Sequence, residues 1–314
     1  MSNSRGGHGV LRWALSLGLA LLSGKAEAQS DLGHKLLGTL GLRAGSQLPT
    51  GLYLADRLVE YTSDALINRS GERIPVEDFD LTGLSNVIGL AFVYQLPGVP
   101  VFYNAAVGLP VAHVSVRTDR AEAAIDRYGL ADAYIQPFKL GLRLPQLDLV
   151  AGYAFYIPTR HFSPGEGSGV SRAHWSHELS LGGTVYADAA RTWHLSALAS
   201  LELNQPKQGV DITRGSTVQI QGGAGKSWFG VLDLGLVGYA LWQVTDDTGP
   251  DLPAVLAGAR DQAYGLGAEL GITIPAARFQ LVVRYTRDLE VQSRPEGQLL
   301  MFSLSFAPWL PSAP

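Results

Sequence analysis

The sequence predicts an all-β protein, a transmembrane antiparallel β-barrel of about twelve strands with short periplasmic turns and longer external loops. Three observations lead to this fold class. From residue 51 onward, apolar and polar residues alternate with a period of two, the pattern of strands that have one apolar face. The connections between these segments alternate between short and long, and the N-terminus has the pattern of an export signal.

The composition excludes several classes of protein. Of the 314 residues, 46% are hydrophobic and only 17% are charged, whereas a soluble domain usually carries about 25% charged residues. A mean hydropathy of +0.10 is too high for a disordered chain. The absence of Cys removes disulfide frameworks and thiolate metal sites, and the net charge of −4 offers no basic excess for nucleic acid.

The N-terminus has the three parts of a secretory signal peptide. Arg5 and Arg12 precede the apolar run 14–22, and the sequence Ala26-Glu27-Ala28 supplies an A-x-A cleavage site. A membrane anchor needs about 18 or more apolar residues, and this run has nine. We therefore predict a signal peptide over 1–28, followed over 29–50 by an N-terminal segment that lies in the periplasm or plugs the barrel.

Twelve segments alternate as strands do. In the segment 147–157, for example, Leu149, Ala151 and Tyr153 share one face, and Asp148 and Val150 lie on the other. Segments of about ten residues have the length that a tilted strand needs to cross a bilayer. The predicted strands of the barrel, over 51–306, are 51–62, 83–95, 100–116, 129–143, 147–158, 175–187, 193–204, 214–226, 231–244, 263–274, 278–290 and 297–306.

The lengths of the connections indicate how the strands are arranged. Every second connection is short, at 96–99, 144–146, 188–192, 227–230 and 275–277. Outer-membrane barrels with an even number of strands have tight periplasmic turns and longer external loops. A soluble β-sandwich has no reason to place all its long loops at one end. Both ends of the barrel segment are therefore expected on the periplasmic side.

Several polar and charged side chains lie on the less apolar faces of the predicted strands. A charge at the centre of a lipid-facing strand costs up to about 2–4 kcal/mol, so these residues are expected to line the lumen. Glu269 and Arg284 lie on neighbouring strands and are expected to pair across the ladder. The candidate lumen-lining residues are Glu178, Glu202, Glu269, Arg284, Asp233, Tyr239 and Gln243.

An acidic cluster follows the ninth strand. Asp246, Asp247 and Asp251 lie close together in a predicted external loop. Oxygen ligands of this kind suit Ca²⁺, but the turn lacks a longer series of ligands, and a solvated turn with Asx hydrogen bonds is favoured. The same carboxylates could repel anionic lipopolysaccharide or contact it through a bridging ion. No metal ligand is assigned.

A hydrolytic site is the enzymatic alternative. His113 and Ser115 are two residues apart on one predicted strand and share a face, as a His and a Ser do in outer-membrane phospholipase A. Here Val116 and Arg117 follow, where that family has Asn-Gly, and no Asn partner is evident. A surface pair near the external end of the strand is favoured, and no catalytic residue is assigned.

The last predicted strand resembles an assembly signal. Leu300, Phe302, Leu304 and Phe306 occupy one face of 297–306, and the strand ends in an aromatic residue. This resembles the C-terminal signature by which the barrel-assembly machinery recognises outer-membrane barrels. Such chains commonly stop at the aromatic residue, whereas here a tail of residues 307–314 follows.

Six segments resemble the outer-membrane transporter family of the meta-pathway of phenol degradation. They are GLYL at 51–54, the stretch 71–75, DAYIQPFKLG at 132–141, AGYAFYIPTR at 151–160, HELSLG at 177–182 and ALWQVTDDTG at 240–249. They occur in the expected order over nearly the whole of 51–306. The segment VDITRGSTV departs from the pattern, because Arg214 and Ser216 stand where the family has Pro and Asp around Gly215.

The resemblance implies a transporter-like role for small hydrophobic or aromatic compounds and supplies no catalytic residues. A twelve-stranded barrel holds a small ligand or a narrow path, not a wide aqueous channel. We therefore expect passive uptake in the cell outer membrane, without cofactor and without enzymatic activity. A structural or surface-exposed barrel without transport is the alternative, as is a lumen packed with mutually satisfied ion pairs. Expected partners are outer-membrane lipid and lipopolysaccharide, the solute and, during biogenesis, the assembly machinery.

Overall fold

The computed structural model describes residues 33–119, 124–163, 169–254 and 256–311. The signal peptide predicted over 1–28 lies outside these residues, as do residues 29–32 of the segment that follows it. Within the described chain, no helix has the length and apolar character needed to cross a membrane.

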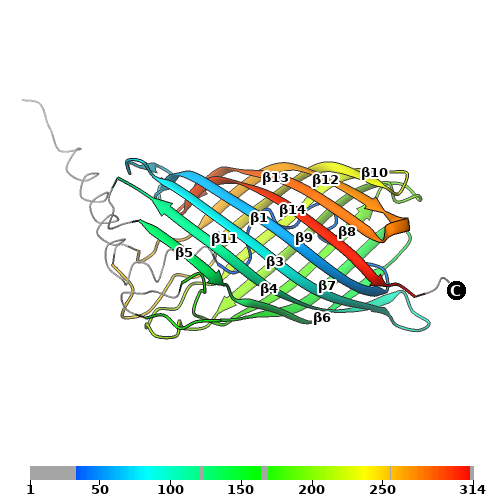
Figure 1. The fold of residues 1–314 in the computed structure, drawn as a ribbon, viewed down its shortest axis with the longest axis horizontal. Helices are drawn as coiled ribbons and strands as arrows, with labels where there is room; N and C mark the ends of the chain where they lie inside the picture. The colour runs from blue at the N-terminus through cyan, green and yellow to red at the C-terminus, as the bar shows by residue number, and fades with distance from the viewer. Residues whose placement is uncertain (1–32, 120–123, 164–168, 255, 312–314) are drawn as a thin grey trace, which may run out of the picture.

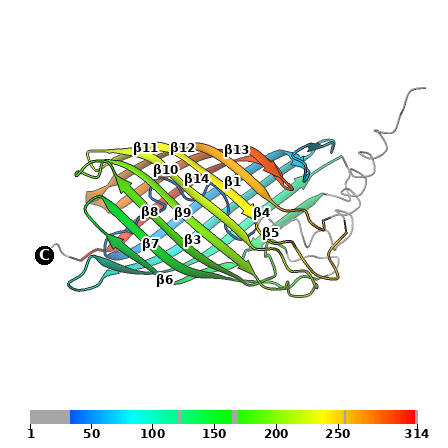
Figure 2. The same cartoon turned by 180° about the vertical axis from the view of Figure 1, so that it is seen from behind.

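Antiparallel β-strands make up most of the described chain (Figures 1 and 2). Twelve long strands and two short ones, β2 and β5, are present in the described residues. The strands are β1 (Gly51–Ile67), β2 (Arg73–Ile74), β3 (Asp80–Gln95), β4 (Val101–Arg117), β5 (Ile125–Leu130), β6 (Ala133–Arg143), β7 (Leu147–Ile157), β8 (Ser176–Tyr186), β9 (Trp193–Asn204), β10 (Thr217–Trp228), β11 (Leu232–Gln243), β12 (Gln262–Ile274), β13 (Phe279–Gln292) and β14 (Pro295–Trp309).

The sheet closes on itself. Each long strand pairs with its neighbour in the chain, and β1 pairs antiparallel with β14 from Leu52↔Trp309 to Leu66↔Pro295. Closure leaves no free edge along the wall, which is the condition for β-structure in a bilayer. The predicted fold class, a twelve-stranded antiparallel barrel, is confirmed.

The strand predicted over 129–143 is interrupted. Its residues form part of β5 and all of β6, and β4 pairs with both. Between them, the Asp132 carboxylate accepts hydrogen bonds from the backbone N–H groups of Thr159 and Arg172. Asp132 therefore fixes the loop between β7 and β8, and the strand that pairs with β4 is interrupted at Asp132.

The last two strands are longer than predicted. β13 and β14 are joined by residues 293–294 alone, so this external connection is a tight turn and not the medium loop that the sequence suggested. Ser293 has a φ of 57°, the left-handed conformation that such a turn uses. β14 continues to Trp309, so its last three residues come from the predicted tail.

The two ends of the barrel differ as predicted. Short turns at 96–100, 144–146, 187–192 and 229–231, with the 3-10 helix Pro275–Ala277, join the strands at one end. This is the end where β1 begins and β14 ends in Figures 1 and 2. The opposite, external end carries the longer connections 68–79, 158–175, 205–216 and 244–261.

The outer face of the barrel is apolar. Leu181, Leu195 and Leu236 expose 66%, 62% and 62% of their surface, although each lies mid-strand in a well-paired ladder. The apolar row predicted for one face of the last strand is also present on the outer face, because Phe302 and Leu304 are exposed and Ser303 between them is buried. A belt of this kind is stable only against lipid.

Residues 33–50 lie inside the barrel. His34 contacts Ser176 at the external end of β8, Gly45 contacts Ser196 of β9, and Arg143 near the periplasmic end of β6 donates to the Gln47 carbonyl. The segment therefore runs along the lumen from the external end to the start of β1, and we call it the lumen segment.

Candidate functional site

The external end of the lumen segment is held at the break between β5 and β6. The His34 ring has Nε2 2.8 Å from Asp132 Oδ2 and Nδ1 2.8 Å from Ser176 Oγ. The ring also stacks on Tyr156, with 4.6 Å between ring centroids. The Glu202 carboxylate, which is 1% exposed, accepts weak hydrogen bonds from the His34 and Lys35 N–H groups at 3.4 Å. The segment thus supplies the donors that this buried carboxylate needs.

A second set of polar contacts holds the middle of the segment. Lys35 Nζ lies 2.5 Å from Glu178 Oε1, and Tyr156 donates to the other oxygen of the same carboxylate. Glu269 Oε2 accepts from Arg284 and from the Leu42 N–H group. Glu178 and Glu269 therefore each accept hydrogen bonds both from the barrel wall and from the lumen segment.

Glycines on the wall allow the segment to approach closely. Leu42 is fully buried, and a Cβ built on Gly225 or Gly235 would lie 2.9 or 2.7 Å from its Cδ2 atom. Such distances are too short for any side chain, so the Leu42 side chain occupies the space that the glycines leave. The wall of β10 and β11 is therefore shaped to receive the segment.

The periplasmic third of the segment is fastened by Arg43. Its guanidinium donates to Asp233 Oδ2 at 3.0 Å and to Ser227 Oγ at 2.7 Å. His194 Nε2 lies 2.8 Å from the other Asp233 oxygen. Asp233 therefore belongs to a cluster of four residues, one of which, Arg43, lies on the lumen segment.

All seven residues proposed for the lumen point inward. Glu178, Glu202, Glu269, Arg284, Tyr239 and Gln243 are each at most 8% exposed, and Asp233 contacts the segment. Glu269 and Arg284 pair directly, with 2.5 Å between Nη2 and Oε2. Glu178 and Glu202 face each other across β8 and β9, and each accepts a hydrogen bond from the lumen segment.

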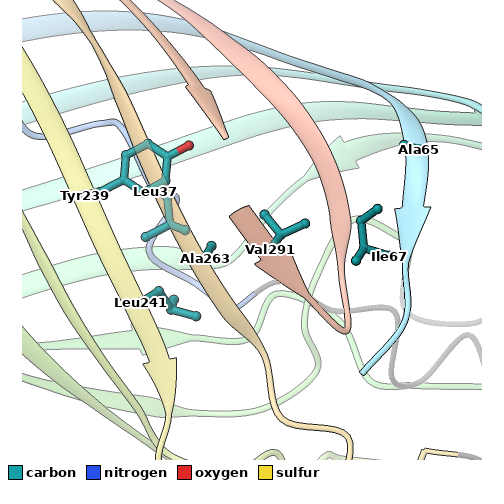
Figure 3. Packing of buried hydrophobic residues seen from close by; sticks show 7 residues of the cluster. All are labelled: Leu37, Ala65, Ile67, Tyr239, Leu241, Ala263 and Val291. Atoms are coloured by element: carbon teal, nitrogen blue, oxygen red, sulfur yellow. The ribbon is translucent and has the colours of Figure 1, made fainter. Parts of the chain in front are cut away.

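Tyr239 belongs to an apolar cluster at the external half of the lumen (Figure 3). Its hydroxyl donates to Asp288 at 2.7 Å, and its ring lies beside Leu37 of the segment in Figure 3. Gln243 lies further out, where its amide donates to Asp247. The other members of the cluster are Ala65, Ile67, Leu241, Ala263 and Val291.

A cavity of about 1000 Å³ lies between the segment and the opposite wall. The segment is bonded mainly to β8–β13, so the space remains on the side of β1, β3, β4 and β5. The lining is mostly apolar and includes Leu36, Leu40, Val59, Val87, Ala112 and Val114. The cavity reaches the external loops at residues 68–75. Its volume is at the upper end of the range for small-molecule sites, about 300–1000 Å³.

The charges in the cavity are unbalanced. Nine Lys and Arg residues and five carboxylates of the described chain line it, whereas the whole chain has a net charge of −4. The cations are Lys35, Arg57, Arg69, Arg73, Arg127, Lys139, Arg172, Lys207 and Arg294, and the anions are Glu72, Asp132, Glu178, Asp261 and Asp288. The cavity therefore has a positive excess inside an acidic protein.

The acidic loop residues have separate partners. Asp246 pairs with Arg260 at 2.7 Å, and this hydrogen bond lowers the pKa of Asp246. Burial raises the pKa of Asp247, which accepts from the Gly215 N–H at 2.6 Å. Asp251 accepts from the Asp211 N–H. Asp247 therefore anchors the segment around Gly215, where the sequence departs from the family pattern.

His113 and Ser115 lie on β4 and face away from the cavity. The cavity is lined by the alternate residues Ala112, Val114 and Val116. His113 Nε2 lies 2.6 Å from Asp126 of β5, and none of the described hydrogen bonds joins His113 to Ser115. The pair is therefore separate from the lumen and is not assembled as a nucleophile and base.

Sequence reasoning missed His34, Lys35 and Arg57. The first two belong to a segment without strand periodicity, and their partners are about 100 to 170 positions away. One signal was available: the glycines at 33, 38, 41 and 45 allow close approach of a backbone to a wall. Arg57 lies in the predicted strand 51–62, on the face opposite to that of Asp56 and Glu60.

Among solved structures, the chain resembles outer-membrane barrels. The COG4313 outer membrane channel from Pseudomonas putida F1 is similar with a TM-score of 0.71 and 19% identity, over 83% of this chain and 97% of that chain. The translocator domain of the autotransporter NalP from Neisseria meningitidis has a TM-score of 0.43 and 10% identity, over 83% and 89%. No curated protein matches the sequence. The apolar belt and the fold place this protein in the cell outer membrane.

The family comparison covers most of the barrel. Residues 63–304 match one family, a span that extends from the end of β1 to the middle of β14. The sequence resemblance noted above is thereby confirmed. The chain belongs to the family described as "Putative MetA-pathway of phenol degradation".

Proposed function

We propose that this barrel mediates the passive uptake of small hydrophobic or aromatic compounds across the outer membrane. The observation that carries the proposal is the apolar cavity of about 1000 Å³ enclosed by the membrane-spanning wall and reaching the external loops. A small apolar solute gains about 25 cal/mol for each Å² of its surface removed from water. Such a site binds weakly and accepts many solutes.

The proposal needs no catalytic step, cofactor or energy coupling. The COG4313 protein with the similar fold is a channel by its description, and family membership agrees with a role in phenol degradation. A compound that leaves the cavity down its concentration gradient is consumed in the cell, which keeps uptake directional.

We propose that the lumen segment acts as a plug that limits the passage of water and ions. It crosses the lumen lengthwise and satisfies Glu178, Glu202 and Glu269 by hydrogen bonds. A barrel of twelve strands with this filling has no room for the aqueous channel of a 16–18-stranded porin. Hydrophobic solutes are then favoured over hydrophilic ones.

We also propose the two partners that the location implies. The external loops meet lipopolysaccharide, and Asp246 paired with Arg260 lies exposed in one of them. The outward row of β14, which includes Phe302 and Leu304, is the feature that the barrel-assembly machinery would read during biogenesis.

A blocked cavity tests the proposed function. Ala112→Trp fills the cavity from β4, and Val107→Trp on the same strand, where Val107 is 48% exposed on the outer face, is the matched control. Each variant would be expressed in cells from which the native gene has been deleted. The initial rates of uptake of labelled phenol and labelled naphthalene would then be measured. Ala112→Trp should slow uptake severalfold, and Val107→Trp should not.

The outcome separates transport from a structural role. Equal uptake by both variants and by cells without the gene would contradict the proposal and favour a structural barrel. Both variants must first reach the outer membrane in equal amounts, which heat-modifiable migration on unboiled gels measures.

A further inference from the structure

Two cations of the cavity lie on long strands of the wall, and within the described residues neither has an ion-pair partner. Arg57 on β1 and Lys139 on β6 both line the cavity. Within the described residues, neither takes part in a salt bridge or a side-chain hydrogen bond. By contrast, the other deep cation, Lys35, lies 2.5 Å from Glu178. Burial of a charge without a partner is costly. A bound anion would supply the partner that the barrel does not provide at these two positions.

The nearby carboxylates are already used. Arg57 lies within electrostatic reach of Glu269, but Glu269 is bonded to Arg284 and to the Leu42 N–H group. Lys139 lies within reach of Glu178, which accepts from Lys35 and from Tyr156. The N–H donors of Arg57 and Lys139 are therefore available to a ligand in the cavity.

The surroundings of Arg57 are apolar. Its partner in the β1–β3 register is Val87, which lines the same cavity, as do Val59 and Leu36. Tyr134 is the polar group within electrostatic reach that is not an ion, and its hydroxyl donates to Gln136. A ligand seated here meets the Arg57 guanidinium beside the apolar side chains of Leu36, Val59 and Val87.

The chemistry of the two groups selects the ligand. A guanidinium presents a planar fork of N–H donors that matches a carboxylate, and it stays charged at every physiological pH. A neutral hydrocarbon would gain nothing from it. We propose that the cavity binds amphipathic monocarboxylates, with the carboxylate on Arg57 and an aromatic or aliphatic body against the apolar lining.

Lys139 then provides a second anion position. β6 runs from the external end toward the periplasmic turn at 144–146, and Lys139 lies in its periplasmic half, next to Gly152 of β7. The positive excess of the lining draws the anion in from the external loops. This inference rests on the proposed function and names the solute class of the same cavity.

Matched pairs of acid and alcohol test the inference. The full chain would be purified into lipid nanodiscs at pH 7, where carboxylic acids are ionised. Equilibrium dialysis against empty nanodiscs would compare 4-phenylbutyrate with 4-phenylbutan-1-ol, and dodecanoate with dodecan-1-ol. Wild-type protein should bind at least one acid about tenfold more tightly than its alcohol, the effect of one hydrogen-bonded charge pair.

Variants assign the effect to the residues. Arg57→Met keeps the volume and removes the charge, so the affinity for the acid should fall toward that of the alcohol while alcohol binding stays unchanged. Arg57→Lys should restore part of the preference. Adding Lys139→Met to Arg57→Met should abolish what preference remains. Arg260→Met, in an exposed loop, is the control and should have no effect.

The outcomes are distinguishable. Equal binding of acid and alcohol to wild-type protein, or an unchanged preference in Arg57→Met, would overturn the inference and leave the proposed function standing. Binding of neither acid nor alcohol would contradict the proposed function itself. Preference for dodecanoate alone, or for 4-phenylbutyrate alone, would support the carboxylate assignment and identify the body as aliphatic or aromatic. Heat-modifiable migration must match that of wild-type protein for every variant.

Discussion

At the residue scale, the lumen shows how buried charges are stabilised in this barrel. Arg284 and Glu269 are both about 6% exposed at the side chain and lie 2.5 Å apart. Arg284 also donates to the Gly38 carbonyl of the lumen segment. Because both ions are desolvated, each depends on the other and on the segment, and removing one leaves an uncompensated charge.

Arg284→Ala should therefore destabilise the barrel. Loss of one partner of a buried pair costs about 3–5 kcal/mol, and the lost bond to Gly38 should also make the lumen more permeable to small solutes. The Glu269→Ala, Arg284→Ala double variant should recover part of the stability, because no lone charge remains. Melting curves and liposome swelling on both variants measure these effects.

The control is an ion pair of similar length at the surface. Arg260 and Asp246 lie 2.7 Å apart but are half-exposed, so solvent screens the pair. Arg260→Ala should leave the melting curve unchanged. Equal behaviour of Arg284→Ala and wild-type protein in both assays would mean that the buried pair contributes nothing.

At the element scale, the lumen segment and the β8–β11 wall fit each other through small residues. Gly45 donates its N–H to Ser196, and its Cα faces the backbone of Gly183 so closely that a Cβ would collide with it. Leu42 lies over Gly225 and Gly235 in the same way. The described part of the segment contains turns but no helix or strand, so its position depends on these contacts and on the hydrogen bonds to the lumen carboxylates.

Gly45→Val should displace the lumen segment without damage to the wall. The added side chain collides with backbone atoms of β8, which cannot move in a paired ladder. If the segment limits ion flow as proposed, single-channel conductance in planar bilayers should rise.

The matched control is Gly83→Ala on β3. A Cβ at Gly83 has 3.9 Å to its nearest neighbour, the Tyr61 carbonyl oxygen, so neither conductance nor stability should change. Unchanged conductance in Gly45→Val would show that the segment is not what closes the lumen.

At the scale of the whole molecule, closure between the first and last strands holds the barrel together. β1 and β14 are paired over thirteen register positions from Leu52↔Trp309 to Leu66↔Pro295, with irregularities at two places. The pairing is formed by residues at opposite ends of the chain, and every other ladder depends on it for curvature.

Engineered cysteines should detect this closure, because the chain contains no Cys. Thr62 and Gln298 are register partners, and directly opposed strand residues have Cα atoms about 4.5–5.5 Å apart, within the range for a disulfide. The Thr62→Cys, Gln298→Cys variant should cross-link on mild oxidation, which gel migration under non-reducing conditions shows.

A second pair checks the register. Thr62→Cys combined with Phe302→Cys places the two thiols on the same outer face but four residues out of register on β14, about 13 Å apart. This variant should not cross-link. Cross-linking of both pairs, or of neither, would contradict the closed barrel with this register.

Much of the architecture could be read from local pattern. Alternation along each strand is a property of neighbouring residues, and it located β9 at 193–204 without error. The inward orientation of Glu202 followed from the same alternation, because a lipid-facing charge is costly. One position departed from the pattern: Asp132 breaks the predicted strand 129–143 because its carboxylate accepts hydrogen bonds from another loop.

The sequence alone determined the fold class and the membrane, since both depend on periodicity and on the cost of placing charge in lipid. Only the tertiary structure decided what the candidate lumen-lining residues meet. The partner of Glu178 is Lys35, 143 positions away, and the cavity beside Arg57 exists because the lumen segment packs against the opposite wall. Such contacts depend on strand tilt, closure and the path of an irregular segment, and none of these leaves a periodic signal along the chain.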